Sequence, residues 1–215
     1  MNTKKIMVYA LFGLFINVAI ASNSARIGYV SDFFYRGEQK AEESVQASVG
    51  LEKNLSGFEA SLRACTNQAV DSSVDSYKIQ GGLSKTFADD LLNAYLGLNH
   101  FEDVAGEPLL EVAVSVSYES LLSPTLSVYR NLDESLYTLE ASLSHEFDVG
   151  FGQLTLGGSA GNTEITKSLD RDYYSVGSAL AKSIGTSELG LSVDYVDADN
   201  IEREFVFGTS LSFQF

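Results

Sequence analysis

Large apolar residues alternate with small or polar residues along the last part of the chain. In residues 205–215 the odd positions carry phenylalanine, leucine or threonine, and the even positions carry valine, glycine, serine or glutamine. Successive side chains of a β-strand point to opposite faces, so this pattern predicts a strand with one apolar face and one small, polar face. A soluble protein rarely ends in an exposed row of large apolar groups, because nothing would cover them. The terminal strand is therefore a first indication that the chain lies in a membrane.

The same alternation recurs along the rest of the chain and predicts twelve strands in all. The strands are expected near residues 26–37, 45–51, 58–64, 77–83, 92–98, 110–118, 124–130, 137–143, 154–160, 173–182, 189–195 and 205–215. Opposite each apolar row lies a row of serine, threonine, glycine, glutamine and charged residues. The outer loops expected near residues 38–44, 68–73, 101–108, 131–134, 163–171 and 196–202 are all short. We therefore expect no loop to fold deeply into the interior as a constricting plug.

Such alternation has two explanations. In a soluble antiparallel sandwich the apolar face points inwards, whereas in a membrane barrel it points outwards to lipid. Strands of ~10 residues suit a tilted bilayer crossing, while strands of soluble proteins average ~5–6 residues. A small polar face would also carry more lysine and glutamate if it faced bulk water. We therefore predict an all-β fold, a transmembrane antiparallel up-and-down β-barrel of about 12 strands.

The N-terminus carries a separate signal. Lys4 and Lys5 precede an apolar run over residues 6–20, and residues 19–21 read Ala-Ile-Ala, a small-x-small cleavage site. This pattern predicts a secretory signal peptide over residues 1–21, followed by a barrel domain over residues 22–215. The alternative is a single membrane anchor, for which the apolar run is short. A signal peptide followed by a barrel predicts that the protein resides in the bacterial outer membrane.

Composition narrows the classes of function. The chain has 29 acidic and 14 basic residues and a net charge of −15, which argues against nucleic-acid partners. Mean hydropathy is +0.02, as expected for a barrel that places its apolar residues in alternation. Cys65 is the single cysteine, so no internal disulfide can form, and we interpret it as a small side chain at a strand position.

Two segments near the N-terminus carry a family resemblance. Residues 31–39 read Ser-Asp-Phe-Phe-Tyr-Arg-Gly-Glu-Gln, and residues 56–62 read Ser-Gly-Phe-Glu-Ala-Ser-Leu. These segments resemble the Ser-Asp-Tyr-x-Phe-Arg-Gly-x-Ser-Gln opening and the following Ser-Gly-Phe-Tyr-Ala-Gly segment of the TorF-type porin family, also catalogued as a Gcw-type family of proteobacterial outer-membrane proteins. Glu38 stands where the family has a small apolar residue, and the serine before Gln39 is missing. The resemblance implies a barrel with a porin role and supplies no catalytic residues.

Charged residues on the expected inner face are the candidates for a functional site. Strand parity selects as pore-lining candidates Asp32, Arg36, Glu59, Arg63, Lys78, Glu111, Glu140 and Asp194. The bases lie on early strands and most of the acids on later strands, so in a closed barrel they would face each other across a narrow lumen. Such an arrangement sets selectivity in pores. The alternative is that the same groups form internal salt bridges in a barrel too narrow to conduct.

The predicted function is a porin-like channel for passive diffusion of small polar solutes or ions, with a weak preference for cations because acids outnumber bases. The alternative is a non-conducting structural or ligand-binding barrel. Expected partners are outer-membrane lipid and lipopolysaccharide, the barrel-assembly machinery through the strand that ends at Phe215, and small polar solutes. No cofactor and no metal site is expected, because the chain has no phosphate loop and no zinc-ligand spacing.

A catalytic role is the rival class of function. The two histidines, His100 and His145, fall at strand ends with outward parity. His145 stands between Ser144 and Glu146, but neighbouring residues of a strand point to opposite faces and cannot form a triad. We therefore predict that the chain is not an enzyme and has no catalytic residues.

Overall fold

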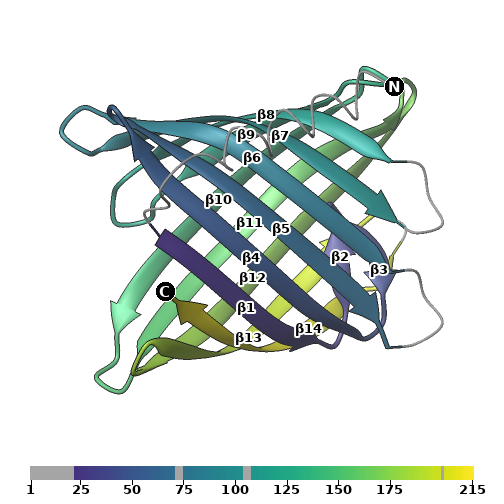
Figure 1. The fold of residues 1–215 in the computed structure, drawn as a ribbon. Coiled ribbons are helices and arrows are strands. Elements are labelled where there is room, and N and C mark those ends of the chain that lie inside the picture. Colours follow the sequence, from purple (N-terminus) through teal and green to yellow (C-terminus); the bar gives the residue numbers. More distant parts are fainter. Residues whose placement is uncertain (1–21, 71–74, 104–107, 200) are drawn as a thin grey trace.

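A computed structural model describes residues 22–70, 75–103, 108–199 and 201–215. The predicted signal peptide, residues 1–21, lies outside the described residues, as do parts of the loops predicted near residues 68–73 and 101–108. Twelve strands form one closed antiparallel barrel, and two short strands form a separate sheet (Figure 1). The prediction of a twelve-stranded all-β barrel is therefore confirmed.

The barrel strands follow one another around the wall in chain order. They are β1 (Ser22–Val30), β4 (Ser44–Leu55), β5 (Phe58–Ala69), β6 (Ser76–Phe87), β7 (Leu92–Asp103), β8 (Leu109–Tyr118), β9 (Thr125–Asn131), β10 (Tyr137–Asp148), β11 (Gln153–Thr166), β12 (Leu169–Ile184), β13 (Ser187–Ala198) and β14 (Glu204–Gln214). The separate sheet consists of β2 (Phe33–Tyr35) and β3 (Glu38–Ala41). No helix among the described residues is long and apolar enough to cross a membrane.

The first and last strands close the barrel. β1 pairs with β14 in an antiparallel register that runs from Ser24 opposite Gln214 to Val30 opposite Gly208. Beyond this ladder, Asn23 and Phe215 exchange backbone N–H···O hydrogen bonds of 3.1 Å in both directions. The terminal strand therefore pairs with the first strand, and no strand edge is left open in the wall.

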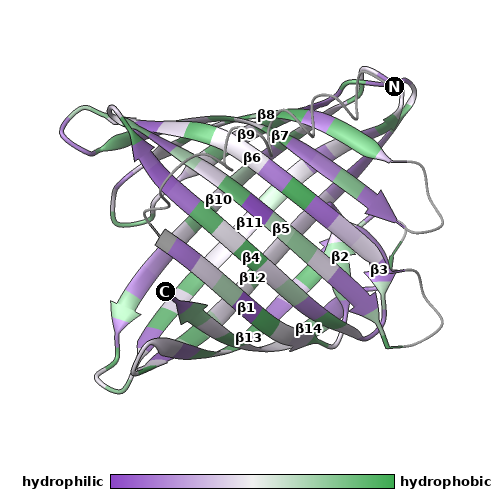
Figure 2. Cartoon of the chain, viewed as in Figure 1, coloured by the Kyte–Doolittle hydropathy of each residue, from purple (hydrophilic) through white to green (hydrophobic). Residues whose placement is uncertain are grey.

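The outer face of the wall is apolar. Hydropathy alternates residue by residue along the strands, as Figure 2 shows. Leu83, Leu96 and Val114 pair in register across β6, β7 and β8, and their side chains are 47%, 58% and 46% exposed. Tyr118 and Tyr137 are also exposed at strand ends. Large apolar groups exposed all around a closed barrel require lipid rather than water as their surroundings.

The inner face is small and polar. Gly82 and Gly97 pair across β6 and β7, and the ring of Tyr95 occupies the space where a Cβ of either glycine would lie. Ser115 and Ser127 share a hydrogen bond of 2.8 Å, and Ser159 and Ser175 one of 2.9 Å. Small side chains keep the wall thin, and the lumen is therefore available to the segments described below.

Candidate functional site: a hairpin inside the barrel

The first strand leaves the wall earlier than the sequence predicts. The backbone N–H of Ser31 still donates to the carbonyl of Phe207 at 2.9 Å, but the N–H of Phe207 donates to the Ser31 hydroxyl instead of to a carbonyl. The side chain of Ser31 thus replaces the next acceptor of the ladder and ends the pairing. The prediction that one wall strand covers residues 26–37 is wrong, because β1 ends at Val30.

Residues 33–41 form a hairpin that turns into the barrel. β2 and β3 pair through Tyr35 opposite Glu38, and the amide of Gln39 donates to Asp32 at 2.9 Å near the base. The two residues at the tip, Arg36 and Gly37, have φ values of 52° and 72°. Positive φ at both central positions is the requirement of a type I′ turn, the tight turn that suits the twist of a two-stranded hairpin.

The tip of the hairpin packs against the wall at β12 and β13. A Cβ on Gly37 would lie 2.7 Å from the Cβ of Tyr173 on β12 and 2.9 Å from the Cβ of Ala198 on β13. Glycine is therefore needed at this position for two reasons: the positive φ and the lack of room for a side chain. Figure 1 shows β2 and β3 within the outline of the barrel, at the end where β5 finishes and β6 begins.

Arg36 makes the strongest contact of the hairpin. Its Nη2 donates to Oε2 of Glu111 on β8 at 2.6 Å, and its Nη1 donates to Oε1 of the same carboxylate, which is 3% exposed. The guanidinium carbon lies 4.2 Å from the ring centroid of Tyr129 on β9, and Nη1 is 3.4 Å from the hydroxyl of Thr138 on β10. Burial alone would lower the pKa of Arg36, but the hydrogen bonds and charge of Glu111 outweigh burial and raise it, so the guanidinium stays charged.

Tyr35 fixes the hairpin against a different part of the wall. Its ring stacks on Phe101 of β7 with a centroid distance of 4.4 Å and an interplanar angle of 2°. The ammonium of Lys78 on β6 lies 5.3 Å from the centroid of the same ring. Burial raises the pKa of Tyr35 well above its ordinary value, so its phenol remains neutral.

A second set of ion pairs holds the β3 strand of the hairpin. Lys40 lies 3.1 Å from Asp103 of β7 and 3.0 Å from Glu38. Glu38 in turn lies 3.6 Å from Arg171 of β12. Together with Arg36 and Tyr35, these groups contact the wall from β6 to β13, so the hairpin spans the lumen.

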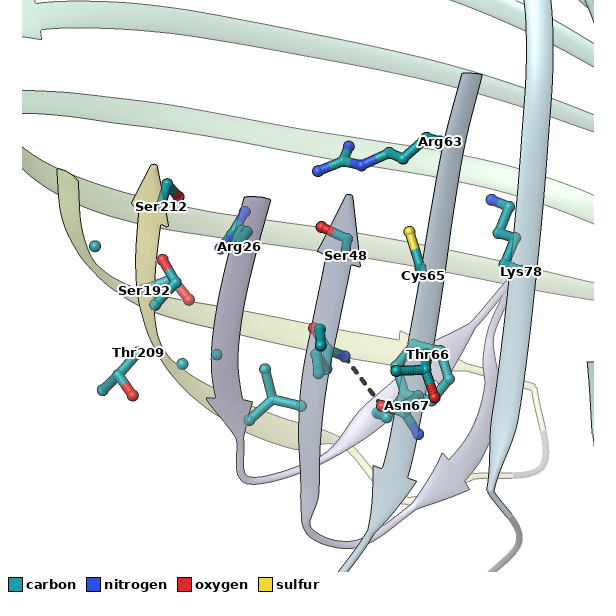
Figure 3. A pocket seen from close by; sticks show the side chains of 18 of the residues that line it. Arg26, Ser48, Arg63, Cys65, Thr66, Asn67, Lys78, Ser192, Thr209 and Ser212 are labelled. Atoms are coloured by element: carbon teal, nitrogen blue, oxygen red, sulfur yellow. Dashed lines mark hydrogen bonds between the residues drawn. The ribbon is translucent and has the colours of Figure 1, made fainter. Parts of the chain in front are cut away.

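Cavities lie on both sides of the hairpin. The larger, about 400 Å³, lies between the hairpin and the wall formed by β12–β14, β1 and β4–β6; Figure 3 shows its basic and small polar side chains. The smaller, about 230 Å³, is lined by Arg36, Lys40 and strands β7–β12. Tyr35 and Phe101 line both cavities, so the stacked pair separates them.

The hairpin corrects three predictions. The expectation that no loop folds into the lumen is wrong, because residues 33–41 do so. Asp32 and Arg36 are not inward-facing residues of a wall strand, because they belong to the hairpin. Arg36 and Glu111 do not oppose each other across an open lumen, because the hairpin carries Arg36 to the Glu111 side, where the two groups are in contact. This pair forms an internal salt bridge.

The other candidates stay on the wall strands. In the register of the sheet, the inner face carries Glu59, Arg63, Lys78, Glu140 and Asp194. Arg63 and Lys78 line the larger cavity, Glu140 accepts a hydrogen bond of 2.7 Å from Tyr173, and the Asp194 carboxylate lies over Gly177. That these residues line a pore stays a prediction.

Sequence reasoning missed the residues that anchor the hairpin, above all Tyr35, Gly37 and Lys40. Two signals were present in the sequence. Phe33, Phe34 and Tyr35 are consecutive aromatic residues and break the period of two that a wall strand needs. They precede Arg-Gly, and glycine at the second position favours a two-residue hairpin turn.

Both histidines lie on the outer face. His100 pairs in register with outward-facing Ile79 and lies 3.4 Å from Glu102, while the ring of His145 packs edge-on against Phe147. Within the described ranges, no group of three or more histidine, cysteine, aspartate or glutamate side chains could hold a metal ion. The absence of catalysis stays a prediction.

Comparison with known proteins supports the architecture. No family model matches the sequence, and no curated protein matches it. Among solved structures, the chain is similar to the KdgM porin (TM-score 0.59, 11% identity, covering 91% of this chain and 99% of that one). It is also similar to the COG4313 outer membrane channel from Pseudomonas putida F1 (TM-score 0.63, 10% identity, 92% and 97%) and to the NanC porin (TM-score 0.57, 10% identity, 89% and 98%).

The fold is that of small outer-membrane β-barrels. Together with the apolar outer face, this fold identifies the protein as a bacterial outer-membrane protein. The finer assignment to the TorF-type family stays a prediction, because identities near 10% reflect shared architecture.

Proposed function

We propose that the protein is a porin-like channel that passes small polar solutes or ions, and that the β2–β3 hairpin sets the width of its lumen. The observation that carries this proposal is the hairpin itself, which spans a lumen whose wall is otherwise small and polar. The lumen of an outer-membrane barrel can be narrowed by a segment that folds inwards from the wall. Similarity to two porins and an outer membrane channel supports the same class of function.

A second candidate is a barrel that is closed at rest. The contacts of Arg36, Tyr35 and Lys40 reach the wall on several sides, and the Glu111 carboxylate is almost fully buried. A segment held this firmly favours a barrel in which the hairpin must move before solute passes. The two candidates predict different currents from the same protein.

Removal of the hairpin separates these candidates. Val30 and Ser44 pair directly in the β1–β4 ladder, so residues 31–43 can be replaced by Asn-Gly, a two-residue turn that keeps the register of the wall. The refolded wild-type barrel and this variant would be recorded as single channels in planar bilayers. We expect small steps from the wild type and several-fold larger steps from the variant. A silent wild type with a conducting variant would favour the barrel closed at rest, and silence from both folded proteins would overturn the channel proposal.

A further inference from the structure

Three basic side chains of the larger cavity lack a carboxylate partner among the described residues. They are Arg26 on β1, Arg63 on β5 and Lys78 on β6. The two cations of the hairpin, Arg36 and Lys40, are both paired with carboxylates. The chain has 29 acidic residues against 14 basic ones, so a shortage of acids does not explain the difference.

Two of the three cations lie in one row across neighbouring strands. Arg26 is in register with Ser48, Ser48 with Cys65, and Cys65 with Lys78. Because adjacent strands are about 4.8 Å apart, the backbones of Arg26 and Lys78 are about 14 Å apart, with the small side chains of Ser48 and Cys65 between them. Figure 3 shows these four side chains along the same wall.

Arg63 completes the arrangement. It precedes Cys65 by two residues on β5 and is in register with Gln80, which makes it a diagonal neighbour of Lys78 at about 7–8 Å between backbones. Its long side chain extends into the same space in Figure 3. The cations therefore stand around a floor of small side chains, where a compact ligand has room.

The cavity has the opposite charge to the rest of the protein. Among the residues that line it, one carboxylate, Glu188, accompanies the three cations. Glu188 is separated from Arg26 by the intervening residue Ser212, at about 10 Å along the row. Glu52 and Glu59 lie nearer the chain termini on the inner face and do not line the cavity. Walls of one sign around a confined space concentrate ions of the opposite sign.

We propose that this cavity binds the carboxylate of a small anionic solute between Arg63 and Lys78, above Ser48 and Cys65. The proposal rests on the channel function and deepens it by naming the charge of the solute. It reverses the cation preference expected from the overall acid excess, because the charges around the cavity, rather than the total, act on a solute inside it. Arginine offers paired N–H groups that match a carboxylate, and the volume of about 400 Å³ is that of a small-molecule site.

Cys65 is a built-in reporter for this site, because it is the single cysteine of the chain and lies in the middle of the row. Its modification in the refolded barrel would be followed by mass spectrometry with an anionic and a cationic methanethiosulfonate. Each rate would be divided by the rate of the same reagent with 2-mercaptoethanol. We expect the normalised rate of the anionic reagent to exceed that of the cationic one about tenfold, since the net positive charge of the cavity attracts the first and repels the second.

Matched variants assign the effect to the cations. Arg63→Gln and Lys78→Gln should each reduce the preference several-fold, and the double variant should abolish it. Lys182→Gln removes one positive charge from an exposed outer-face position of β12 and should leave the preference unchanged. An equal preference in all variants, or a Cys65 that reacts with neither reagent, would overturn the proposal.

Protection identifies the ligand class directly. Glucuronate and glucose differ by a carboxylate in place of a hydroxymethyl group, and both would be tested as inhibitors of Cys65 modification by a neutral thiol reagent. We expect glucuronate to slow the reaction at concentrations where glucose does not, and equal effects of the two would count against the proposal. The assay needs no ion current, so a barrel that protects Cys65 but conducts nothing would refute the channel and leave the anion site standing.

Discussion

Arg36 and Glu111 form a two-pronged ion pair inside the barrel, although the hairpin that carries Arg36 leaves the wall at β1 and Glu111 belongs to β8, across the barrel from β1. The pair is almost entirely withdrawn from water, with side-chain exposures of 10% and 4%. An isolated charge at such depth is costly, so each partner depends on the other. The position of the hairpin is therefore coupled to one carboxylate on β8.

The first prediction concerns loss of this carboxylate. Glu111→Gln leaves the guanidinium of Arg36 buried without a counter-charge, a change that costs about 3–5 kcal/mol when both groups stay in place. The hairpin can instead leave the wall and solvate Arg36, so we expect the cost to appear as opening rather than as unfolding of the barrel. Single-channel recording should show at least a tenfold longer time in the larger conductance level.

Two comparisons test whether the ion pair causes this effect. Glu146→Gln removes a carboxylate from the inner face of β10. This carboxylate accepts a hydrogen bond of 2.7 Å from Gln153 and does not touch the hairpin, so its loss should leave the current levels unchanged. Exchange of the partners, Arg36→Glu with Glu111→Arg, should restore much of the wild-type behaviour. If the exchange opens the barrel as fully as Glu111→Gln does, the ion pair is not what holds the hairpin in its closed position.

The second prediction uses two glycines with similar backbones and different surroundings. Gly37 has φ +72° and no room for a Cβ, whereas Gly57, in the turn between β4 and β5, has φ +86° and nothing within 4 Å. Alanine at either position should lower the free energy of unfolding by about 1 kcal/mol through strain in the left-handed region.

Conductance should distinguish the two variants. Gly37→Ala must also push the hairpin tip away from Tyr173 and Ala198, so its channel should have larger or more frequent open levels than the wild type. Gly57→Ala should match the wild type in current, since its turn lies away from the hairpin. Equal currents from both variants would mean that close contact with β12 and β13 does not hold the hairpin in place.

The strands of the wall follow from periodicity, whereas the hairpin does not. A wall strand imposes a period of two on its residues. The outward position of Leu83 and Leu96 and the inward position of Glu111 can therefore be predicted from sequence alone. The hairpin imposes no such period, because its residues contact different strands of the curved wall. Arg36 meets Glu111 only because the closed barrel places β8 opposite β1, and this relation is not local in sequence.

The third prediction tests the direction of the two faces. Leu83 and Ser84 are adjacent on β6, and the register places Leu83 on the outer face and Ser84 on the inner face opposite Glu59. Leu83→Lys should lower the stability of the folded barrel in lipid vesicles by about 2 kcal/mol, because an ammonium group then faces hydrocarbon. Ser84→Lys places the same group beside Glu59 and should change stability little. Urea titrations in vesicles measure both, and equal losses would contradict the assigned faces.

The last prediction concerns the terminal aromatic residue. Phe215 is 75% exposed, and its two backbone hydrogen bonds to Asn23 lie at the edge of the barrel. Deletion of Phe215 should therefore cost the folded barrel only about 1 kcal/mol or less in detergent.

If the assembly machinery recognises this strand by its final aromatic group, the same deletion should reduce the amount of folded protein in the outer membrane of cells several-fold. Phe213→Ala removes an outward-facing phenylalanine from the same strand but keeps the terminal one, so it should assemble nearly normally. Equal assembly defects would show that the whole apolar face, rather than the terminal residue, is recognised.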